Sequence, residues 1–158
     1  MIKSVVLTII TKDNAMLLIK RRKSGEFKDY LAIPGGKVEP AEHISEAARR
    51  ELMEEAGVES DFKEYLGCVS EILIENDEVK NNFILHLCEL SIHSEDFLQS
   101  EEGEVSWYDL SSIENLKNEI IPSDYEMIQR FVINKEKSYF NCVEEKVGEE
   151  YFIRKFDK

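Results

Sequence analysis

The segment from Gly36 to Val58 places chemically reactive side chains at fixed spacings. It follows the pattern G-x5-E-x7-R-E-U-x-E-E-x-G-U, where U is a bulky aliphatic residue and x is any residue. Clustered carboxylates beside a glycine loop suit a hard divalent cation, because Mg2+ prefers carboxylate oxygens and keeps waters for substrate phosphates. The specified positions are Gly36, Glu42, Arg50, Glu51, Leu52, Glu54, Glu55, Gly57 and Val58.

A helix is predicted over Ile44–Ala56, within this segment. The run lacks Gly and Pro and is rich in good helix formers, and Gly57 stands where a helix commonly stops. Ile44, Ala48 and Leu52 recur at helical spacing, which indicates an edge that faces a core. The helix therefore has a buried aliphatic side and leaves its acidic side free.

Three glutamates share the acidic side of this predicted helix. Successive residues turn by about 100°, so Glu55 lies about 40° from Glu51, and Glu54 lies about 60° away on the other side. Like charges at this spacing destabilise a helix. Arg50 offsets part of the repulsion, and a divalent cation would offset more. The alternative is a solvated acidic face. Glu42 either contacts Arg50 or favours the positive end of the helix.

Flexible backbone and basic side chains precede the helix. Pro34-Gly35-Gly36 forms a loop of little bulk, where a backbone carbonyl can approach a ligand. The dense basic cluster Lys20–Lys23 is either a solvated strand end or a contact for substrate phosphate. If the cluster contacts phosphate, we expect its residues Arg21 and Arg22 to bind substrate, together with Lys37 after the glycine loop.

The rest of the chain alternates strand patterns with a few helices. We expect a hairpin at the start, a polar loop over 24–30, and a turn-rich stretch over 75–82. Ser111-Ser112 is expected to cap a short helix, and a second helix starts at Pro122. The pattern predicts a sheet covered by helices in a single domain over residues 1–158. Strands are expected at 2–11, 16–20, 65–74, 83–92, 105–110, 139–147 and 151–156.

Composition limits the classes of protein. The 158 residues suffice for one domain with a real core, and 42% of them are hydrophobic. A formal net charge of −13 disfavours nucleic-acid polymers and anionic membranes as partners. The three cysteines have no paired spacing and indicate free thiols in a reducing compartment. No long apolar span or cleavable leader is present, so a cytoplasmic location is expected.

The segment from Gly36 to Val58 resembles the signature of the Nudix (MutT-like) hydrolases. This resemblance implies an α/β/α sandwich with a mixed sheet, a loop-helix-loop at the signature and a second helix after the sheet. It implies Mg2+, with Mn2+ as a substitute, bound by Glu51, Glu54, Glu55 and the Gly36 carbonyl. Arg50 would orient the glutamates. Glu51 would help activate water, and Glu54 is included among the catalytic residues.

Looser similarity extends beyond the signature to the branch that sanitises oxidised nucleoside triphosphates such as 8-oxo-dGTP. Here it rests on Glu102-Gly103, Trp107, and Pro122 with Asp124. The resemblance implies that Glu102 completes the metal site and that Asp124 reads the base. Glu101 and Glu104 compete with Glu102, and all three also fit a solvated loop. Asp124 also fits a helix cap, and Trp107 fits sheet packing.

Two departures from family patterns bear on the substrate. Ala32 stands where some purine-reading relatives carry an asparagine, and its side chain forms no hydrogen bond, which weakens 8-oxo-guanine specificity. The ADP-ribose branch carries a proline some way after the signature, whereas no proline lies between Pro40 and Pro122 here.

The expected activity is Mg2+-dependent hydrolysis of a nucleoside triphosphate, with oxidised forms included, to the monophosphate and pyrophosphate. One alternative is a broader nucleoside-diphosphate-X hydrolase acting on a sugar nucleotide, ADP-ribose or a dinucleotide polyphosphate. The other is a non-catalytic nucleotide-sensing domain. The expected partner is the nucleotide alone, and the protein is expected to be a monomer or a homodimer.

Overall fold

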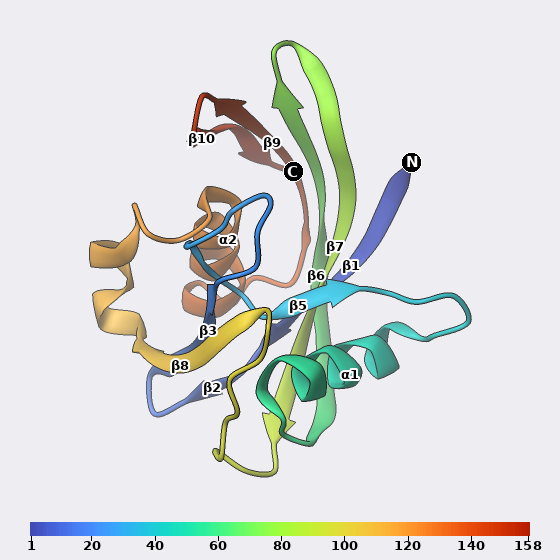
Figure 1. Ribbon diagram of the computed structural model, residues 1–158, viewed down its shortest axis with the longest axis vertical. Coiled ribbons are helices and arrows are strands. Elements are labelled where there is room, and N and C mark those ends of the chain that lie inside the picture. Colours follow the sequence, from blue (N-terminus) through green and yellow to red (C-terminus); the bar gives the residue numbers. More distant parts are fainter.

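The computed structural model describes residues 1–158 as a mixed sheet flanked by helices (Figure 1). The central strands are β1 (Ile2–Ile9), β5 (Gly35–Lys37), β6 (Ser60–Glu75), β7 (Glu78–Ile92), β9 (Tyr139–Val147) and β10 (Glu150–Asp157). A second sheet holds β2 (Thr11–Lys12), β3 (Ala15–Arg21), β4 (Leu31–Ala32) and β8 (Gly103–Asp109). The helices are α1 (Ile44–Ala56), the 3-10 helix η1 (Leu110–Leu116), α2 (Pro122–Met127) and the π-helix η2 (Ile128–Ile133).

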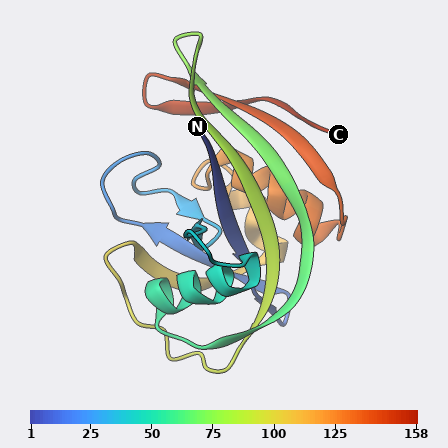
Figure 2. The same ribbon diagram turned by 90° about the vertical axis from the view of Figure 1, so that its right-hand side faces the viewer.

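The six-stranded sheet runs in the order β10-β9-β6-β7-β1-β5. Strand β1 pairs with β7 in parallel, and β6 pairs with β9 in parallel, while the other neighbours are antiparallel. Figure 2 shows the long β6–β7 hairpin curving through the whole molecule. The central sheet is therefore mixed, as predicted.

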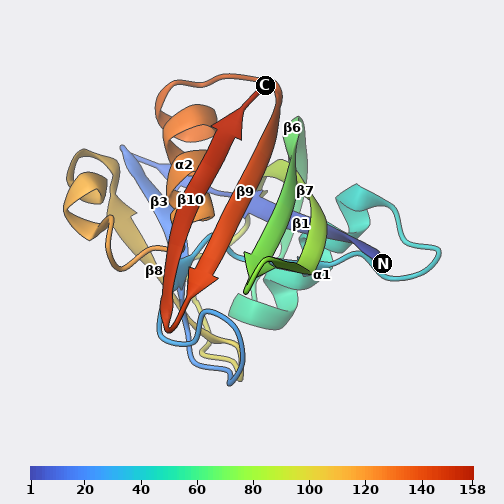
Figure 3. The same cartoon turned by 90° about the horizontal axis from the view of Figure 1, so that it is seen from above.

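Two hydrophobic clusters connect the helices to the sheets. One contains Ala47, Ala48 and Leu52 of α1, all fully buried, so the aliphatic edge predicted for this helix does face a core. The other contains Met127 and Phe131 from α2 and η2. Figure 3 shows the β9–β10 hairpin beside α2 and away from α1. This layering confirms the predicted Nudix-type α/β/α sandwich.

Several predicted boundaries were wrong. Strand β1 does not form a hairpin with β3, because the chain changes sheets after Ile9 and only the two-residue β2 pairs with the start of β3. The turn between β6 and β7 is only Asn76-Asp77, since both residues adopt positive φ (54° and 62°) and so form a tight hairpin that lengthens both strands.

The two helices near the C-terminus also begin or continue differently from the prediction. The side chain of Asp109, not that of Ser111, caps η1 by accepting a hydrogen bond from the Ser111 N–H. The helix from Pro122 continues from α2 into a π-helix that ends at Ile133. None of the helices is long and apolar enough to cross a membrane.

Candidate functional site

The glycine strand β5 lies against the acidic side of α1. Thr8 of β1 fixes the segment that precedes β5. Its backbone N–H and its hydroxyl both donate to the Pro34 carbonyl, at 2.8 and 2.9 Å. A β-carbon at Gly35 would collide with the Val6 carbonyl, and one at Gly36 would overlap the Glu51 carboxylate. Gly35 is therefore needed for β5 to lie against β1, and Gly36 is needed for β5 to lie against α1.

Arg50 connects the acidic residues around this contact. Its guanidinium donates to both carboxyl oxygens of Glu42, at 2.7 and 2.9 Å, and to Glu51 Oε1 at 2.9 Å. It also reaches Glu54 at 3.2 Å and the Lys37 carbonyl at 2.9 Å. The hydrogen bonds from Arg50 lower the pKa of the Glu42 carboxyl to about 2. Of the two alternatives for Glu42, the contact with Arg50 is the one present.

The three glutamates of α1 have different surroundings. The Glu51 side chain is 14% exposed, Glu54 is 57% exposed, and Glu55 is buried. The Gly35 N–H is near enough to the Glu55 carboxylate to lower its pKa, whereas Glu55 Oε1 is buried without a hydrogen-bond partner. Glu51 and Glu55 thus face the glycine strand, and Glu54 faces solvent beside Arg50.

Burial and mutual repulsion act on the two inner carboxyls. Burial raises the pKa of Glu51. Burial raises the pKa of Glu55 well above its usual value, and the charges of Glu51 and Glu102 raise it further. Glu102 lies just before β8 and pairs with Lys23 at 3.1 Å, while Glu104 pairs with Arg22 at 3.2 Å. Glu102 is the acidic residue of its loop whose charge acts on both inner carboxyls.

These residues suit a hard divalent cation in the type of donor they offer. Glu51, Glu55 and Glu102 supply carboxylate oxygens, and the buried Glu55 Oε1 lacks any donor that would satisfy it. No group of three acidic, histidine or cysteine side chains is arranged to hold a metal ion, so Glu51, Glu55 and Glu102 do not form a complete ligand shell. A cation at this place would offset the repulsion that raises the pKa of Glu55.

The residues predicted to bind substrate lie in separate places. Arg22 is exposed and paired with Glu104, and the Lys37 side chain is exposed next to the glycine strand. Arg21 is half-buried, and its guanidinium lowers the pKa of both Glu55 and Asp124. Its charge therefore reaches both the glycine–helix contact and the start of α2.

Asp124 is buried and does not cap α2. The N-cap position is Ile121, which offers no side-chain hydrogen bond. Instead, Asp124 Oδ2 accepts a hydrogen bond from the Ile33 N–H at 2.8 Å and so ties α2 to the residue after β4. Trp107 packs near Phe97 and donates to Glu95 at 2.9 Å, in agreement with a role in packing.

Sequence analysis missed two buried acids near Asp124, namely Glu71 and Glu144. Both belong to strands in which every second residue is buried, and the buried neighbours of Glu71 are Val69 and Leu73. An acidic residue at an inward position of an alternating strand was the available signal.

A family model described as NUDIX domain matches residues 1–131 of the chain. The protein belongs to the NUDIX domain family. The match ends before β9, so the β9–β10 hairpin lies outside the matched residues of this NUDIX protein.

Three curated relatives of the NUDIX protein are named as a CTP pyrophosphohydrolase, an ADP-ribose pyrophosphatase and a nucleoside triphosphatase. It is 32% identical to an Escherichia coli K12 CTP pyrophosphohydrolase over 81% of this chain and 90% of that protein. It is 50% identical to a Methanocaldococcus jannaschii ADP-ribose pyrophosphatase over 39% of this chain and 36% of that protein. The match to the Escherichia coli nucleoside triphosphatase NudI also spans only 40% of that relative's length.

Solved structures share the fold of this NUDIX protein. A MutT protein from Bacillus halodurans superposes with a TM-score of 0.74 over 96% of this chain and 97% of its own, at 20% identity. A NUDIX hydrolase from Nitrosomonas europaea gives 0.73 over 91% of this chain and 79% of its own, at 21% identity. At these identities the likeness establishes the fold.

Proposed function

We propose that this protein is a divalent-cation-dependent pyrophosphohydrolase that cleaves a nucleoside triphosphate, oxidised forms included, to the monophosphate and pyrophosphate. The observation that carries the proposal is the contact between β5 and α1. There Gly36 leaves room for the Glu51 carboxylate, and Arg50 fixes that carboxylate by a 2.9 Å hydrogen bond. The similarity to a CTP pyrophosphohydrolase across 90% of that relative supports the same class of substrate.

Each residue of the contact has a role in the proposed reaction. Glu51, Glu55, Glu102 and the Gly36 carbonyl would hold Mg2+ or Mn2+, with Glu54 at the exposed margin. A bound cation supplies a lowered pKa for the attacking water and neutralises charge on the phosphates. Arg50 keeps Glu51 oriented, and Glu51 accepts a proton from the water. The exposed side chains of Lys37 and Arg22 bind the phosphates of the substrate.

A second candidate is hydrolysis of ADP-ribose or another nucleoside-diphosphate-X compound. The similarity to an ADP-ribose pyrophosphatase favours it, although that match covers 62 residues. The two candidates differ in their products, since ADP-ribose releases AMP and a sugar phosphate, whereas a triphosphate releases pyrophosphate. A non-catalytic sensing domain would release neither.

The decisive experiment incubates the protein with Mg2+ and a panel of nucleoside triphosphates, 8-oxo-dGTP, ADP-ribose and dinucleotide polyphosphates, and measures the products. We expect pyrophosphate from at least one triphosphate. Glu51→Gln should lower kcat by at least about 100-fold, because the proton acceptor is lost. Glu46→Gln, at an exposed position of the same helix, is the matched control and should keep the rate. An absence of turnover across the panel would overturn the enzymatic function.

A further inference from the structure

Part of the central sheet has no helix over it on the side that carries α1. Directly paired residues of a sheet point to the same side, and Ser4, Ile84 and Ser70 are paired across β1, β7 and β6. Leu85 and Val69 alternate with them, point the other way, and are buried in the cluster that contains α2 and η2. Figure 2 shows that α1 crosses only the lower part of the sheet. The upper part, which we call the open face, carries the partly or fully exposed side chains of Ser4, Cys68, Ser70, Ile72, Ile84 and His86.

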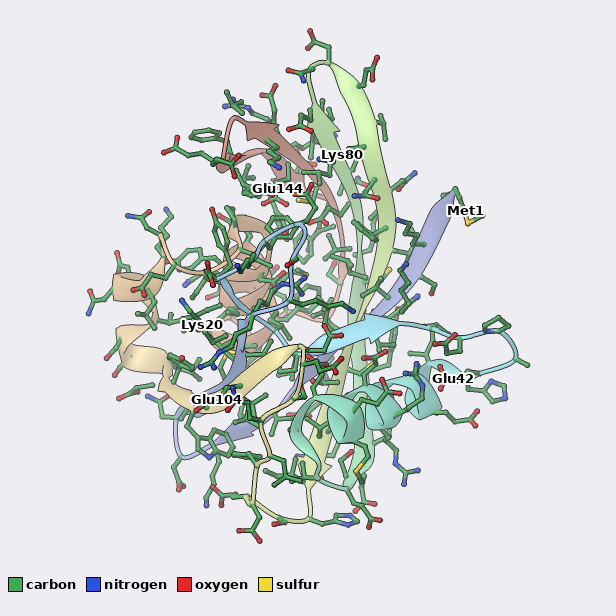
Figure 4. The ribbon with its side chains drawn as sticks, viewed as in Figure 1. Met1, Lys20, Glu42, Lys80, Glu104 and Glu144 are labelled. Carbon is green, nitrogen blue, oxygen red and sulfur yellow. The ribbon has the colours of Figure 1, made fainter.

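The open face is uncharged, although the chain has 33 acidic residues and a formal net charge of −13. Asn141 and Val143 extend it onto β9 without a charge, since both pair with residues of β6 on this face. Figure 4 shows Glu144, the next residue of β9, on the α2 side of the sheet instead. Charged side chains begin at the margin, where Glu145 pairs with Arg154 at 2.8 Å. A neutral patch therefore interrupts the acidic surface of the molecule.

The polar side chains at the centre of the open face bind one another. Ser4 Oγ lies 3.1 Å from His86 Nε2, and the Tyr65 hydroxyl lies 2.8 Å from His86 Nδ1. Burial lowers the pKa of His86, so its ring is neutral at pH 7. These groups would keep their hydrogen bonds if the face were covered, so covering it costs little. It would also remove apolar area from water, because Tyr65 is 42% exposed and Tyr139 is 46% exposed.

The pairing and the size of the open face both suit a covered surface. Parallel strands normally lie in sheets that are covered on both sides, and this face spans the parallel pairs β1–β7 and β6–β9. Four strands about 4.8 Å apart, with about eight residues each at about 3.3 Å per residue, make a face of about 500 Å2. Two such faces together bury about 1,000 Å2, which is close to the smallest area of a specific interface. The open face is therefore large enough for a weak, reversible contact.

We propose that two copies of this chain associate through their open faces around a twofold axis. A twofold contact sets one patch against the same patch, so a charged patch would repel its own copy. Two chains with a net charge of −13 can meet through a neutral face without bringing carboxylates together. A basic partner, in contrast, would be recognised through carboxylates, which the open face lacks. This association does not depend on the proposed reaction.

Sedimentation velocity from about 1 to about 200 μM tests the association. Wild-type protein should shift from the mass of one chain toward that of two as its concentration rises. Ile84→Glu should raise the dissociation constant by at least about 10-fold, because it sets two carboxylates against each other across the axis. Ile133→Glu is the matched control, since Ile133 is 41% exposed and ends η2, on the other side of the sheet. It should leave the dissociation constant unchanged.

Alkylation of Cys68 by a maleimide identifies the surface that is covered. Cys68 is half-buried on the open face, whereas Cys88 and Cys142 are buried. The alkylation rate should fall as the concentration of wild-type protein rises and should stay constant in Ile84→Glu, while Cys68→Ser assigns the labelled thiol.

Three results would overturn the proposal. They are a single chain at every concentration, a dimer that Ile84→Glu leaves intact, and an alkylation rate of Cys68 that does not depend on the concentration of wild-type protein. If Ile84→Glu fails to fold, Ile72→Glu on β6 takes its place, with the same outcomes deciding.

Discussion

Arg50 determines where the carboxyl oxygens beside the glycine strand lie. It binds Glu42, Glu51 and Glu54 at once, and it also holds the Lys37 carbonyl. The guanidinium fork can serve several oxygens in a fixed plane, which a lysine ammonium cannot. Glu51 is consequently presented to the glycine strand in one orientation, although its own burial raises its pKa.

Gly36→Ala should weaken the binding of Mg2+ or Mn2+ by about 10-fold or more, because the new β-carbon would overlap the Glu51 carboxylate and pull it away from Arg50. Isothermal calorimetry with each cation measures the effect. Gly148→Ala is the control: its φ of 63° strains alanine as at Gly57, but it lies in the turn between β9 and β10, away from α1, so the cation affinity should not change. An unchanged cation affinity in Gly36→Ala would show that Glu51 does not bind the cation from this position.

Helix α1 packs on the core with one edge and carries the glutamates on the other. Ala47, Ala48 and Leu52 are fully buried and fix the helix on the core. The opposite edge carries the glutamates, and Glu55 lies at the boundary because it is buried against Gly35. Packing of the aliphatic edge therefore fixes the position of the glutamate carboxylates relative to β5.

Gly57→Ala should lower the free energy of unfolding by about 1 kcal/mol or more, because residue 57 ends α1 with a left-handed φ of 70° that alanine adopts at a cost, and because its β-carbon would lie 2.8 Å from the Leu98 side chain. Urea denaturation monitored by circular dichroism measures it. Gly57→Asn should lose less, since asparagine tolerates this conformation better. Equal stability of the alanine variant and the wild type would contradict a strained C-cap.

On the scale of the whole molecule, the two long parallel pairings bring distant segments together. Strand β9 pairs with β6 in parallel, and this pairing carries Glu144 to Glu71 although the two are far apart in sequence. The N-terminus of α2 then closes the group with Asp124. Three acidic residues from three elements thus share one buried place.

The buried carboxyls of Glu71, Asp124 and Glu144 should make the fold less stable as pH rises. Burial raises the pKa of Asp124 to about 7 and that of Glu144 to about 9, so the folded state holds protons that the unfolded chain releases near pH 4. These bound protons stabilise the folded state fully below about pH 4. Their contribution declines as pH rises and is lost once pH exceeds the pKa values of Asp124 and Glu144 in the folded state. Urea unfolding should show a loss of at least about 1 kcal/mol between pH 6 and pH 9.

Glu144→Gln tests this pH dependence, because an amide has no proton to lose in this range. Its stability should fall less than that of the wild type between pH 6 and pH 9. Glu145→Gln, at the neighbouring position that pairs with Arg154, should retain the wild-type slope. A Glu144→Gln variant with the wild-type slope would assign the pH dependence to other groups.

Local patterns along the chain were sufficient for much of the fold. The bounds of α1 followed from its helix formers and Gly57, and β9 followed from its alternating residues. The starting hairpin is present around its predicted turn, but its first arm is only β2, because pattern alone does not say that Ile2–Ile9 joins the other sheet. The predicted strands were shorter than β6 and β7, because the tight turn at Asn76-Asp77 allows the two strands to pair up to residues 75 and 78.

The sequence by itself determined the spacing of glycines, arginine and glutamates from Gly36 to Val58, because a helix converts such spacing into one acidic edge. Only the tertiary structure decided that Glu55 is buried, that Glu54 is exposed, and that Glu42 binds Arg50. It alone revealed that Glu71 and Glu144 are buried near each other, since they meet through the pairing of β6 with β9. The burial of a side chain and its hydrogen-bond partners depend on residues that are far apart in the chain. These residues come together only when the sheet forms.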